Sequence, residues 1–360
     1  MAELTVQLRT LTPLWTGGVD GTMDRIHETG ILGSLRWWFE AIVRGLGGSA
    51  CDPTKHEHEL SGQRLKRYEQ ARREGKDWWT ALDEAGICDA CKVFGTTGWR
   101  RRFRMEVVDE TFEDTSSPKK ISANRPINPK TKRPPTWWLP GYPRVGNLTV
   151  RIQSFSQNFH PEIITGLIQF IANWAALGAK TQMGFGVVEL VDSKVDTQSL
   201  FEWLKKSITG SNTWSDLPSL RNIFWARISP KNKKQFNDQE TFNLKYDLRR
   251  LFASDKDLRH FIMGTTEDSR IATKVKISRP YNNGQEIRLW GWIPEDAEVY
   301  KENWNREKIV NMIYEHLKKH YTLQIWREMN SSRDTAKSNN SDIWLFLSCL
   351  LGLKEKSNEA

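Results

Sequence analysis

Hydrophobic residues follow strand and helix periodicities in the first half of the chain. Apolar and polar residues alternate from Leu4 to Leu8, which predicts an opening strand. Apolar residues then recur at helical spacing from Ile31 to Val43, and the pattern stops at Gly45, a residue typical of helix ends. Further strands are predicted around Met105, at 147–155 and at 183–192, and a second helix at 160–178. The first half therefore predicts the order strand, helix, strand, strand, helix, strand.

The second half of the chain repeats pieces of the first. HETGILGSLRWWF, which begins at His27, is echoed with one gap by QETFNLKYDLRRLF from Gln239, so that Arg36 and Arg249 fall at matching places. FGTTG from Phe94 is echoed by MGTTE from Met263. Strands are predicted at 274–278 and 286–294, and a long helix at 305–326. Repetition of one strand–helix pattern predicts two related domains.

These patterns predict an α+β protein made of two tandem ferredoxin-like (βαββαβ) domains. We assign residues 1–200 to the first domain and 201–360 to the second, with the division somewhere in 195–225. The echoed pieces lie further apart in the first half, which indicates that the Cys-containing segment 51–90 is an insertion. Residues 110–145 are rich in Pro, Ser and Lys and predict a long loop or protruding hairpin.

Charge and composition favour a polyanionic partner. Lys and Arg number 53 against 44 Asp and Glu, for a formal net charge of +9, and the 17 Trp offer stacking surfaces. No apolar run is long enough to span a membrane, and the N-terminus lacks the pattern of a secretory signal. We therefore expect a cytoplasmic protein with no membrane partner, whose four Cys are reduced or metal-bound.

Candidate phosphate contacts gather near the first helix. Gly17 and Gly18 let the backbone approach a phosphate closely, and Ser34 lies where free N–H groups bind anions. Arg36 and Arg44 are two helical turns apart and can share a face, although Arg36 can equally pair with Glu40.

Aromatic and basic residues elsewhere extend this candidate surface. Of the neighbouring Trp37 and Trp38, periodicity puts Trp38 on the apolar face, so Trp37 is the candidate for base stacking. Arg100, Arg102 and Arg104 alternate along a predicted strand and form either a phosphate-tracking stripe or a solvated, charge-protected edge.

A cluster of Cys and His within the insertion has zinc-ligand character. Cys88 and Cys91 form a Cys-x-x-Cys pair, and Cys51, His56 and His58 precede them. Cys51, one His and the Cys-x-x-Cys pair would complete a tetrahedral zinc site that fastens the insertion; the alternative is a set of reduced thiols.

Several motifs in order resemble the RAMP superfamily: TPLWTGG from Thr12, MDRIHETGILGSLRWWFE from Met23, CDACKVFG from Cys88 and GAKTQMGFG from Gly178. LRWWFEAIVR and RLWGWIP resemble in particular the first-subunit family of the type III-B CRISPR (Cmr) module. The resemblance runs from residue 4 to about 295. It implies ferredoxin-like RAMP domains, with 110–145 in the place of an inserting thumb, and Lys180 as the one basic residue kept in the family's Gly-rich loop.

The resemblance implies a non-catalytic, RNA-binding subunit that holds guide (CRISPR) RNA and target single-stranded RNA beside other Cmr subunits, with no required cofactor. The internal echo of Arg36 at Arg249 makes Arg249 a matching candidate RNA contact. Two alternatives remain open: a metal-independent endoribonuclease that uses Asp24 and His27, and an assembly adaptor that contacts protein alone.

Overall fold

The computed structural model describes residues 2–18, 21–52, 55, 59–127, 132–156, 159–191, 195–266, 270–301, 303–336 and 341–353. Its first sheet has four antiparallel strands in the order β2-β5-β1-β6. The strands are β1 (Glu3–Thr10), β2 (Phe103–Glu113), β5 (Arg144–Ser154) and β6 (Val188–Leu190). The helices α1 (Glu28–Gly45), α5 (Glu162–Trp174) and α6 (Gln198–Ser207) cover one face of it.

The second half builds another antiparallel sheet, in the order β10-β7-β9-β8. Its strands are β7 (Ile223–Ser229), β8 (Val275–Ile277), β9 (Ile287–Trp292) and β10 (Thr322–Glu328). Its helices are α7 (Gln239–Leu251), α8 (Lys256–Met263), α9 (Arg306–His320) and α10 (Ile343–Leu350). The predicted α+β class is confirmed. The predicted long helix over 305–326 is wrong at its end, because α9 stops at His320 and β10 begins at Thr322.

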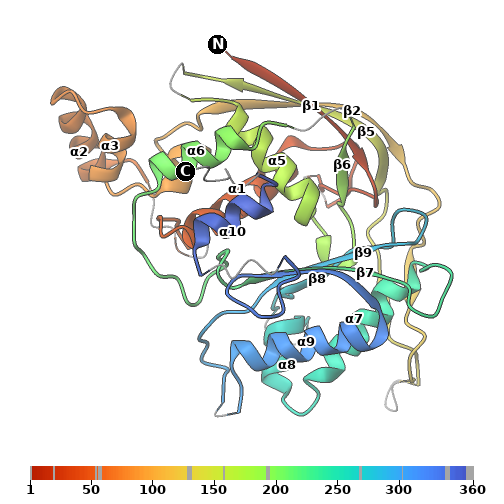
Figure 1. The fold of residues 1–360 in the computed structure, drawn as a ribbon. Helices are drawn as coiled ribbons and strands as arrows, with labels where there is room; N and C mark the ends of the chain where they lie inside the picture. Colours follow the sequence, from red (N-terminus) through yellow and green to blue (C-terminus); the bar gives the residue numbers. More distant parts are fainter. Residues whose placement is uncertain are drawn as a thin grey trace, which may run out of the picture.

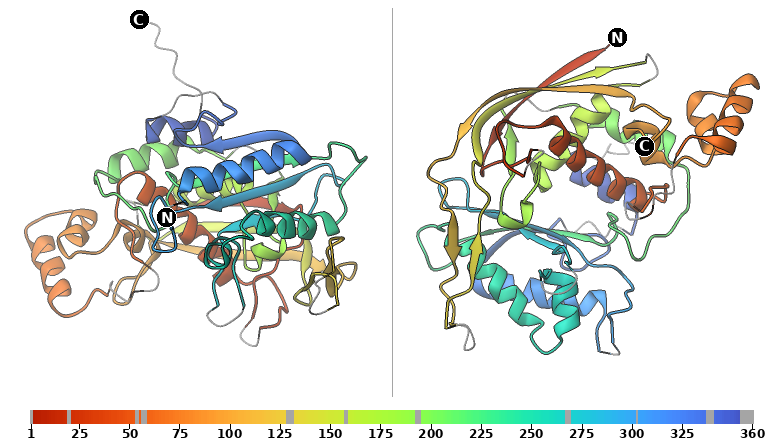
Figure 2. Two further views of the ribbon diagram at one scale, coloured as in Figure 1. Left: turned by 90° about the horizontal axis from the view of Figure 1, so that it is seen from below. Right: turned by 180° about the vertical axis from the view of Figure 1, so that it is seen from behind.

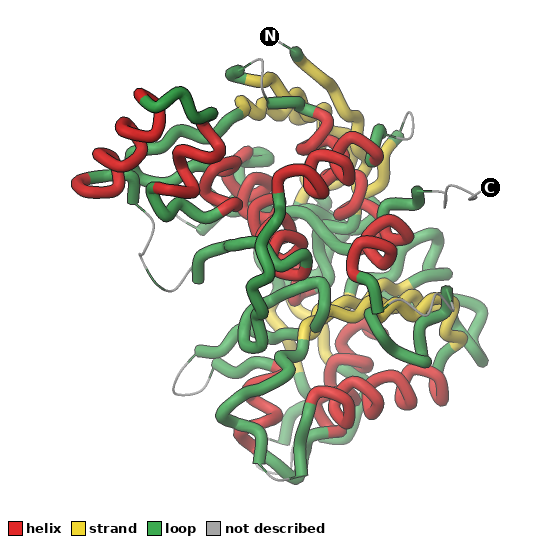
Figure 3. Tube along the Cα trace, turned by 60° about the vertical axis from the view of Figure 1, so that its left-hand side comes forward, coloured by secondary structure: helices red, strands yellow, loops and turns green. Residues whose placement is uncertain are grey.

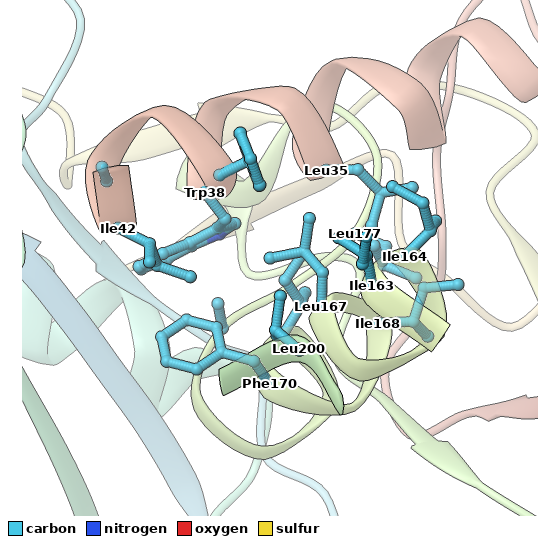
Figure 4. Packing of buried hydrophobic residues seen from close by; sticks show 14 of the residues in the cluster. Leu35, Trp38, Ile42, Ile163, Ile164, Leu167, Ile168, Phe170, Leu177 and Leu200 are labelled. Atoms are coloured by element: carbon cyan, nitrogen blue, oxygen red, sulfur yellow. The ribbon is translucent and has the colours of Figure 1, made fainter. Parts of the chain in front are cut away.

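Four layers are stacked in the molecule (Figure 1). The first sheet lies on α1, α5 and α6, while α1, α5 and α10 lie on the second sheet, and α7, α8 and α9 cover its far side. Figure 3 shows the same succession from another side. One hydrophobic core joins the halves: Trp225 and Trp290 of the second sheet belong to the same buried cluster as Trp38 of α1 and Phe346 of α10. Figure 4 shows α1 and α5 interdigitating in this core through residues such as Leu35 and Leu167.

The repeated sequence pieces make the same contacts in both halves. Arg36 of α1 donates from Nη1 to the carbonyl oxygen of Gly95 (3.1 Å), and Arg249 of α7 donates from Nη1 to that of Gly264 (2.7 Å). Both glycines have positive φ, 87° and 75°, and each ends a short helix. A Cβ on either would come within 3 Å of backbone nitrogen. The sequence echo therefore corresponds to the same arginine-to-glycine-carbonyl hydrogen bond in each half.

The segment 51–90 folds into helices that the sequence pattern did not predict. They are α2 (Gly62–Arg73), α3 (Trp78–Glu84) and the start of α4 (Asp89–Phe94), and α2 and α3 stand out from the body (Figure 1). Within 110–145, β3 (Lys120–Ser122) and β4 (Thr136–Trp138) pair as the predicted hairpin. No helix among the described residues is long and apolar enough to cross a membrane.

The hairpin runs down beside the second half of the chain (Figure 2). Gln239 Nε2 of α7 donates to the carbonyl oxygen of Ser122 at 2.7 Å, and the ring of Trp137 lies 5.2 Å from that of Phe242. The hairpin is therefore anchored on α7, while the residues between its strands that lie at 128–131 are outside the described part.

Candidate nucleic-acid interface

Two neighbouring cavities lie between α1 and the edge of the second sheet formed by β8 and β9. The larger measures about 530 Å³ and the smaller about 370 Å³. Both are lined by Trp37, Trp38, Lys276 and Trp290, so they form one groove between the two halves of the chain. We call this the interdomain groove. Trp37, Trp38, Trp290 and Trp292 are its aromatic lining residues, and its described charged residues are Glu40, Arg44, Asp52, Arg270, Lys274 and Lys276.

Lysines with lowered pKa values lie in and beside the groove. Burial lowers the pKa of Lys245 to about 7 and those of Lys274 and Lys276 to about 8. The charge of Lys276 lowers the pKa of the other two further, which shows that the three ammonium groups share one region. Among the described residues, no carboxylate forms a salt bridge with any of them.

These ammonium groups are instead held by backbone oxygens. Lys245 Nζ donates to the carbonyl of Gln182 at 2.8 Å and Lys274 Nζ to that of Phe261 at 3.0 Å, while Lys276 Nζ donates to Thr273. The Phe261 ring centroid lies 3.5 Å from Lys274 Nζ. Because carbonyls and a ring leave the net positive charge uncompensated, the cluster favours an anion.

The two adjacent tryptophans of α1 lie as the periodicity predicts. Trp38 is 3% exposed and its ring stacks on Trp225 at 6.1 Å between centroids. Trp37 is half-buried and lines both cavities of the groove. Its role as a stacking surface for a base stays a prediction, now with a cavity beside the ring.

The Gly-rich loop closes one end of the groove. Ser34 Oγ accepts from the backbone N–H of Gly178 at 2.9 Å, so its hydroxyl fastens this loop to α1 while Ser34 lines the smaller cavity. Lys180 has φ of 57° just before the 3-10 turn η1 (Thr181–Met183), and it is exposed. Its Nζ lies 5.3 Å from the Trp15 ring centroid.

The predicted glycine pair lies beside the same tryptophan. Gly17 has φ of 74°, and a Cβ there would come within 2.9 Å of the Trp15 ring. The N–H of Gly18 donates to the carbonyl of Thr22 at 2.5 Å. Glycine at 17 is therefore required by the turn itself, and a phosphate contact by this pair stays a prediction.

Arg36 and Arg44 do not form one exposed face. Arg36 Nε donates to Glu40 Oε1 at 2.9 Å, the pairing on the next helical turn that the sequence offers as the alternative to RNA contact. Arg44 is 2% exposed and donates to the carbonyls of Pro218 (3.1 Å) and Cys51 (2.8 Å). Both guanidiniums therefore connect parts of the protein, and Arg44 contributes only a portion of the groove wall.

The three alternating arginines before and within β2 have different surroundings. Arg100 lies over the Phe155 ring at 3.8 Å, and Arg102 lies over the rings of Trp78 (4.8 Å) and Trp99 (5.2 Å). Arg104 is exposed and pairs with Glu106. These contacts do not test RNA binding by the stripe, but they show that Arg102 also fastens the insertion to the sheet.

The sequence reasoning missed Lys274 and Lys276, although the repeat could have revealed them. The N–H of Arg102 donates to the Val93 carbonyl, and the N–H of Lys274 donates to the Ile262 carbonyl, at 3.0 and 2.8 Å. Lys274 and Lys276 thus occupy the places that Arg102 and Arg104 hold in the first half. Aligning the two halves on FGTTG and MGTTE, and looking in the second half for basic residues that match the arginine stripe, would have identified them.

The cysteines of the insertion come together. Cys51, Cys88 and Cys91 have sulfur atoms that all lie within 4.8 Å of one another. Neighbouring sulfur atoms and burial raise the pKa of Cys91 to about 11, and that of Cys88 is also raised. The candidate ligands His56 and His58 lie outside the described residues.

Asp24 and His27 form a pair at the surface near the start of α1. His27 Nε2 and Asp24 Oδ1 are 2.7 Å apart, and the Asp24 side chain is 72% exposed. The hydrogen bond from His27 lowers the pKa of Asp24. The pair has the geometry of a carboxylate that orients an imidazole.

A family model described as the RAMP superfamily matches residues 7–189, just over half of the chain, and the chain therefore belongs to that superfamily. Among solved structures, Cmr1 from Pyrococcus furiosus in its apo form shares 15% sequence identity, with 88% of this chain and 97% of that chain covered and a TM-score of 0.44.

Two more distant structures were also found. A chain of the type III-B Cmr-beta structure bound to cognate target RNA shares 13% identity over 86% of this chain and 99% of that chain, with a TM-score of 0.38. Cmr6 from Pyrococcus furiosus shares 14% identity over 53% of this chain and 98% of that chain, with a TM-score of 0.26. A search of curated protein sequences gave no match.

Proposed function

We propose that this RAMP protein is a non-catalytic, RNA-binding subunit of a cytoplasmic type III-B CRISPR (Cmr) effector complex, in antiviral defence. Its ligands are guide RNA and target single-stranded RNA, and its protein partners are other Cmr subunits. The motifs shared with the first-subunit family of that module favour this assignment over other RAMP roles. The observation that carries RNA binding is the interdomain groove, where Trp37 and the uncompensated Lys274 and Lys276 line one cavity.

We also infer that the two halves are tandem ferredoxin-like RAMP domains. Numbered along its own half, each sheet has its first and third strands at the centre and its second and fourth strands at the edges. The central strands are β1 and β5 in the first sheet and β7 and β9 in the second. The matching bonds of Arg36 and Arg249 support a common origin of the halves. The division falls between α6 and β7, since α6 packs on α5 of the first half, where Leu200 lies against Gly166.

The groove offers the two contacts that single-stranded RNA requires. The ammonium groups of Lys274 and Lys276 compensate phosphate charge, and the Trp37 ring presents a stacking surface to an unpaired base. Neither contact reads base identity, so we expect little sequence preference. Cavities of about 530 and 370 Å³ are also too small to enclose a duplex, which favours single-stranded segments.

A salt series tests the proposal directly. Single-stranded RNA should bind the purified chain or its reconstituted complex more tightly than duplex RNA does. The logarithm of the affinity should fall with the logarithm of salt concentration, with a slope of about −0.7 for each phosphate held. Affinity that is insensitive to salt would favour the adaptor alternative, in which the basic charge faces acidic protein partners.

We expect RNA affinity to fall as the pH rises. The groove lysines Lys274 and Lys276 have a pKa of about 8 in the free protein, and a bound phosphate raises their pKa, so binding takes up protons. Affinity should fall by about 10- to 100-fold between pH 6.5 and 9, since each proton taken up changes it at most tenfold per pH unit.

The stability of the RNA-free protein should change in the opposite direction. The unfolded lysines keep their usual pKa, so above about pH 8 the unfolded chain binds more protons and the folded chain gains stability as pH rises. Affinity and melting temperature measured from pH 6.5 to 9.5 check both signs. An affinity that does not vary across this range would exclude the lysine cluster from the binding site.

A metal-independent endoribonuclease is the second candidate function, because the exposed Asp24–His27 pair is within hydrogen-bond distance. With a metal chelator present, we expect the wild-type chain to cleave single-stranded RNA no faster than a His27→Ala variant does. The control is His160→Ala, which removes the imidazole of an exposed histidine outside this pair. Cleavage in chelator that His27→Ala abolishes and His160→Ala retains would replace the non-catalytic assignment.

A further inference from the structure

We propose that Cys51, Cys88 and Cys91 bind a structural zinc ion that fastens the inserted segment to α1. The three residues come from two separate segments, the loop after α1 and the start of α4. Cys51 is half-buried, and Cys88 and Cys91 are buried. This inference concerns metal binding and does not depend on the RNA-binding function.

The spacing of the sulfur atoms fits tetrahedral zinc. Zinc–thiolate bonds of about 2.3 Å at tetrahedral angles place two sulfur atoms about 3.8 Å apart. The Sγ atoms of Cys51 and Cys91 are 3.7 Å apart, and all three sulfur atoms lie within 4.8 Å of one another. A disulfide needs about 2.05 Å, so the observed separation favours ligands around an ion over a bonded pair. The fourth position takes water or one further side chain.

Arg36 supplies the charge that such a site needs. Three thiolates and Zn²⁺ carry a net charge of −1, and Arg36 Nη2 lies 3.2 Å from Cys91 Sγ and 3.8 Å from Cys51 Sγ. A guanidinium that donates to ligand sulfur stabilises the thiolate form and orients the ligand. The same arginine bonds Glu40 and Gly95, so it is held in place from two sides.

The backbone around the cysteines is fixed independently of a metal. Asp89 Oδ2 accepts from the N–H of Ser49 at 2.7 Å, and Lys92 Nζ donates to Asp89 Oδ1 at 2.8 Å. Arg44 Nη2 donates to the carbonyl of Cys51 at 2.8 Å. The loop of Cys51 is therefore bonded to α4 through Ser49 and Asp89, and to α1 through Arg44. Preorganisation of this kind lowers the cost of assembling a metal site.

Metal content measured on the full chain tests the proposal. Protein purified from zinc-supplemented cells without chelators or a metal-affinity tag should contain about one zinc ion per chain, by elemental mass spectrometry. Cys88→Ser and Cys91→Ser should each lose the zinc on dialysis. The control is Cys349→Ser in α10, which removes the remaining cysteine and should keep the metal.

Reconstitution with cobalt keeps the test decisive where a serine variant does not fold. Wild-type protein freed of zinc and loaded with Co²⁺ should show thiolate-to-cobalt charge-transfer absorption and the visible bands of tetrahedral cobalt. Absence of these bands from the cobalt-loaded wild-type protein would overturn the proposal, as would a loss of zinc from Cys349→Ser equal to that from Cys88→Ser and Cys91→Ser. RNA affinity is a separate readout, so failure here leaves the groove untouched.

Discussion

Replacing Lys274 and Lys276 with methionine should weaken single-stranded RNA binding by about 100-fold or more. Each lysine offers a charge-assisted contact to phosphate, worth about 1.5–3 kcal/mol, and a loss of about 2.8 kcal/mol is 100-fold in affinity. Both side chains line the interdomain groove, and no other described cation there has so lowered a pKa. Affinity for RNA measured at fixed pH and salt checks the result.

The same double variant should be more stable than the wild type. Burial disfavours both ammonium groups in the folded protein, and methionine fills a similar volume without a charge, so the free energy of unfolding at pH 7 should rise by about 2 kcal/mol. Lys205→Met with Lys206→Met is the matched control, because it removes the same charge from exposed positions on α6. Equal loss of RNA affinity in both double variants would mean that net charge, and not the groove, binds RNA.

Trp225→Ala should destabilise the whole chain by about 3–5 kcal/mol, the usual cost of removing a buried tryptophan. Trp225 is 1% exposed, and its ring lies about 6 Å from the rings of Trp38, Phe170, Trp174 and Phe346. These neighbours come from α1, α5, the end of α5 and α10, so one side chain joins the second sheet to the helices of the first half.

Denaturant unfolding followed by tryptophan fluorescence and circular dichroism checks this expectation. Because the halves share one core, both signals should shift together to lower denaturant in Trp225→Ala. Trp138→Ala is the control: Trp138 is 71% exposed on β4, and its loss should change stability by less than about 0.5 kcal/mol. Two separated transitions in the wild type would contradict a shared core.

The sequence predicted the central strands and helices because their periodicities are strong. It extended α9 too far for a specific reason. Leu317, Tyr321 and Ile325 continue the helical spacing of four, although Tyr321, Leu323 and Ile325 also alternate as in a strand. Pairing of β10 with β7 settles this ambiguity, and that pairing joins residues about 100 positions apart. The helix α2 was not predicted because only Ala71 is buried in it, which leaves no apolar stripe to recognise.

The candidate site was predicted in part for similar reasons. Helical periodicity distinguished Trp37 from Trp38, and the Cys-x-x-Cys pair led to the sulfur cluster. Arg36 and Arg44 looked like surface contacts because charge alone does not show which carbonyls and carboxylates lie near. The groove itself is formed by α1 and by strands about 240 residues later in the chain, so no local pattern reveals it.

Photocross-linking tests the central claim most directly. Single-stranded RNA carrying 4-thiouridine is bound to the chain, either alone or in a reconstituted Cmr complex, and the sample is irradiated. Mass spectrometry then identifies the cross-linked peptides. The groove predicts cross-links in the peptides that contain Trp37 and residues 270–292, and their loss in the Lys274→Met/Lys276→Met variant. Cross-links confined to the Arg100–Arg104 stripe or to the β3–β4 hairpin would contradict RNA binding in the interdomain groove.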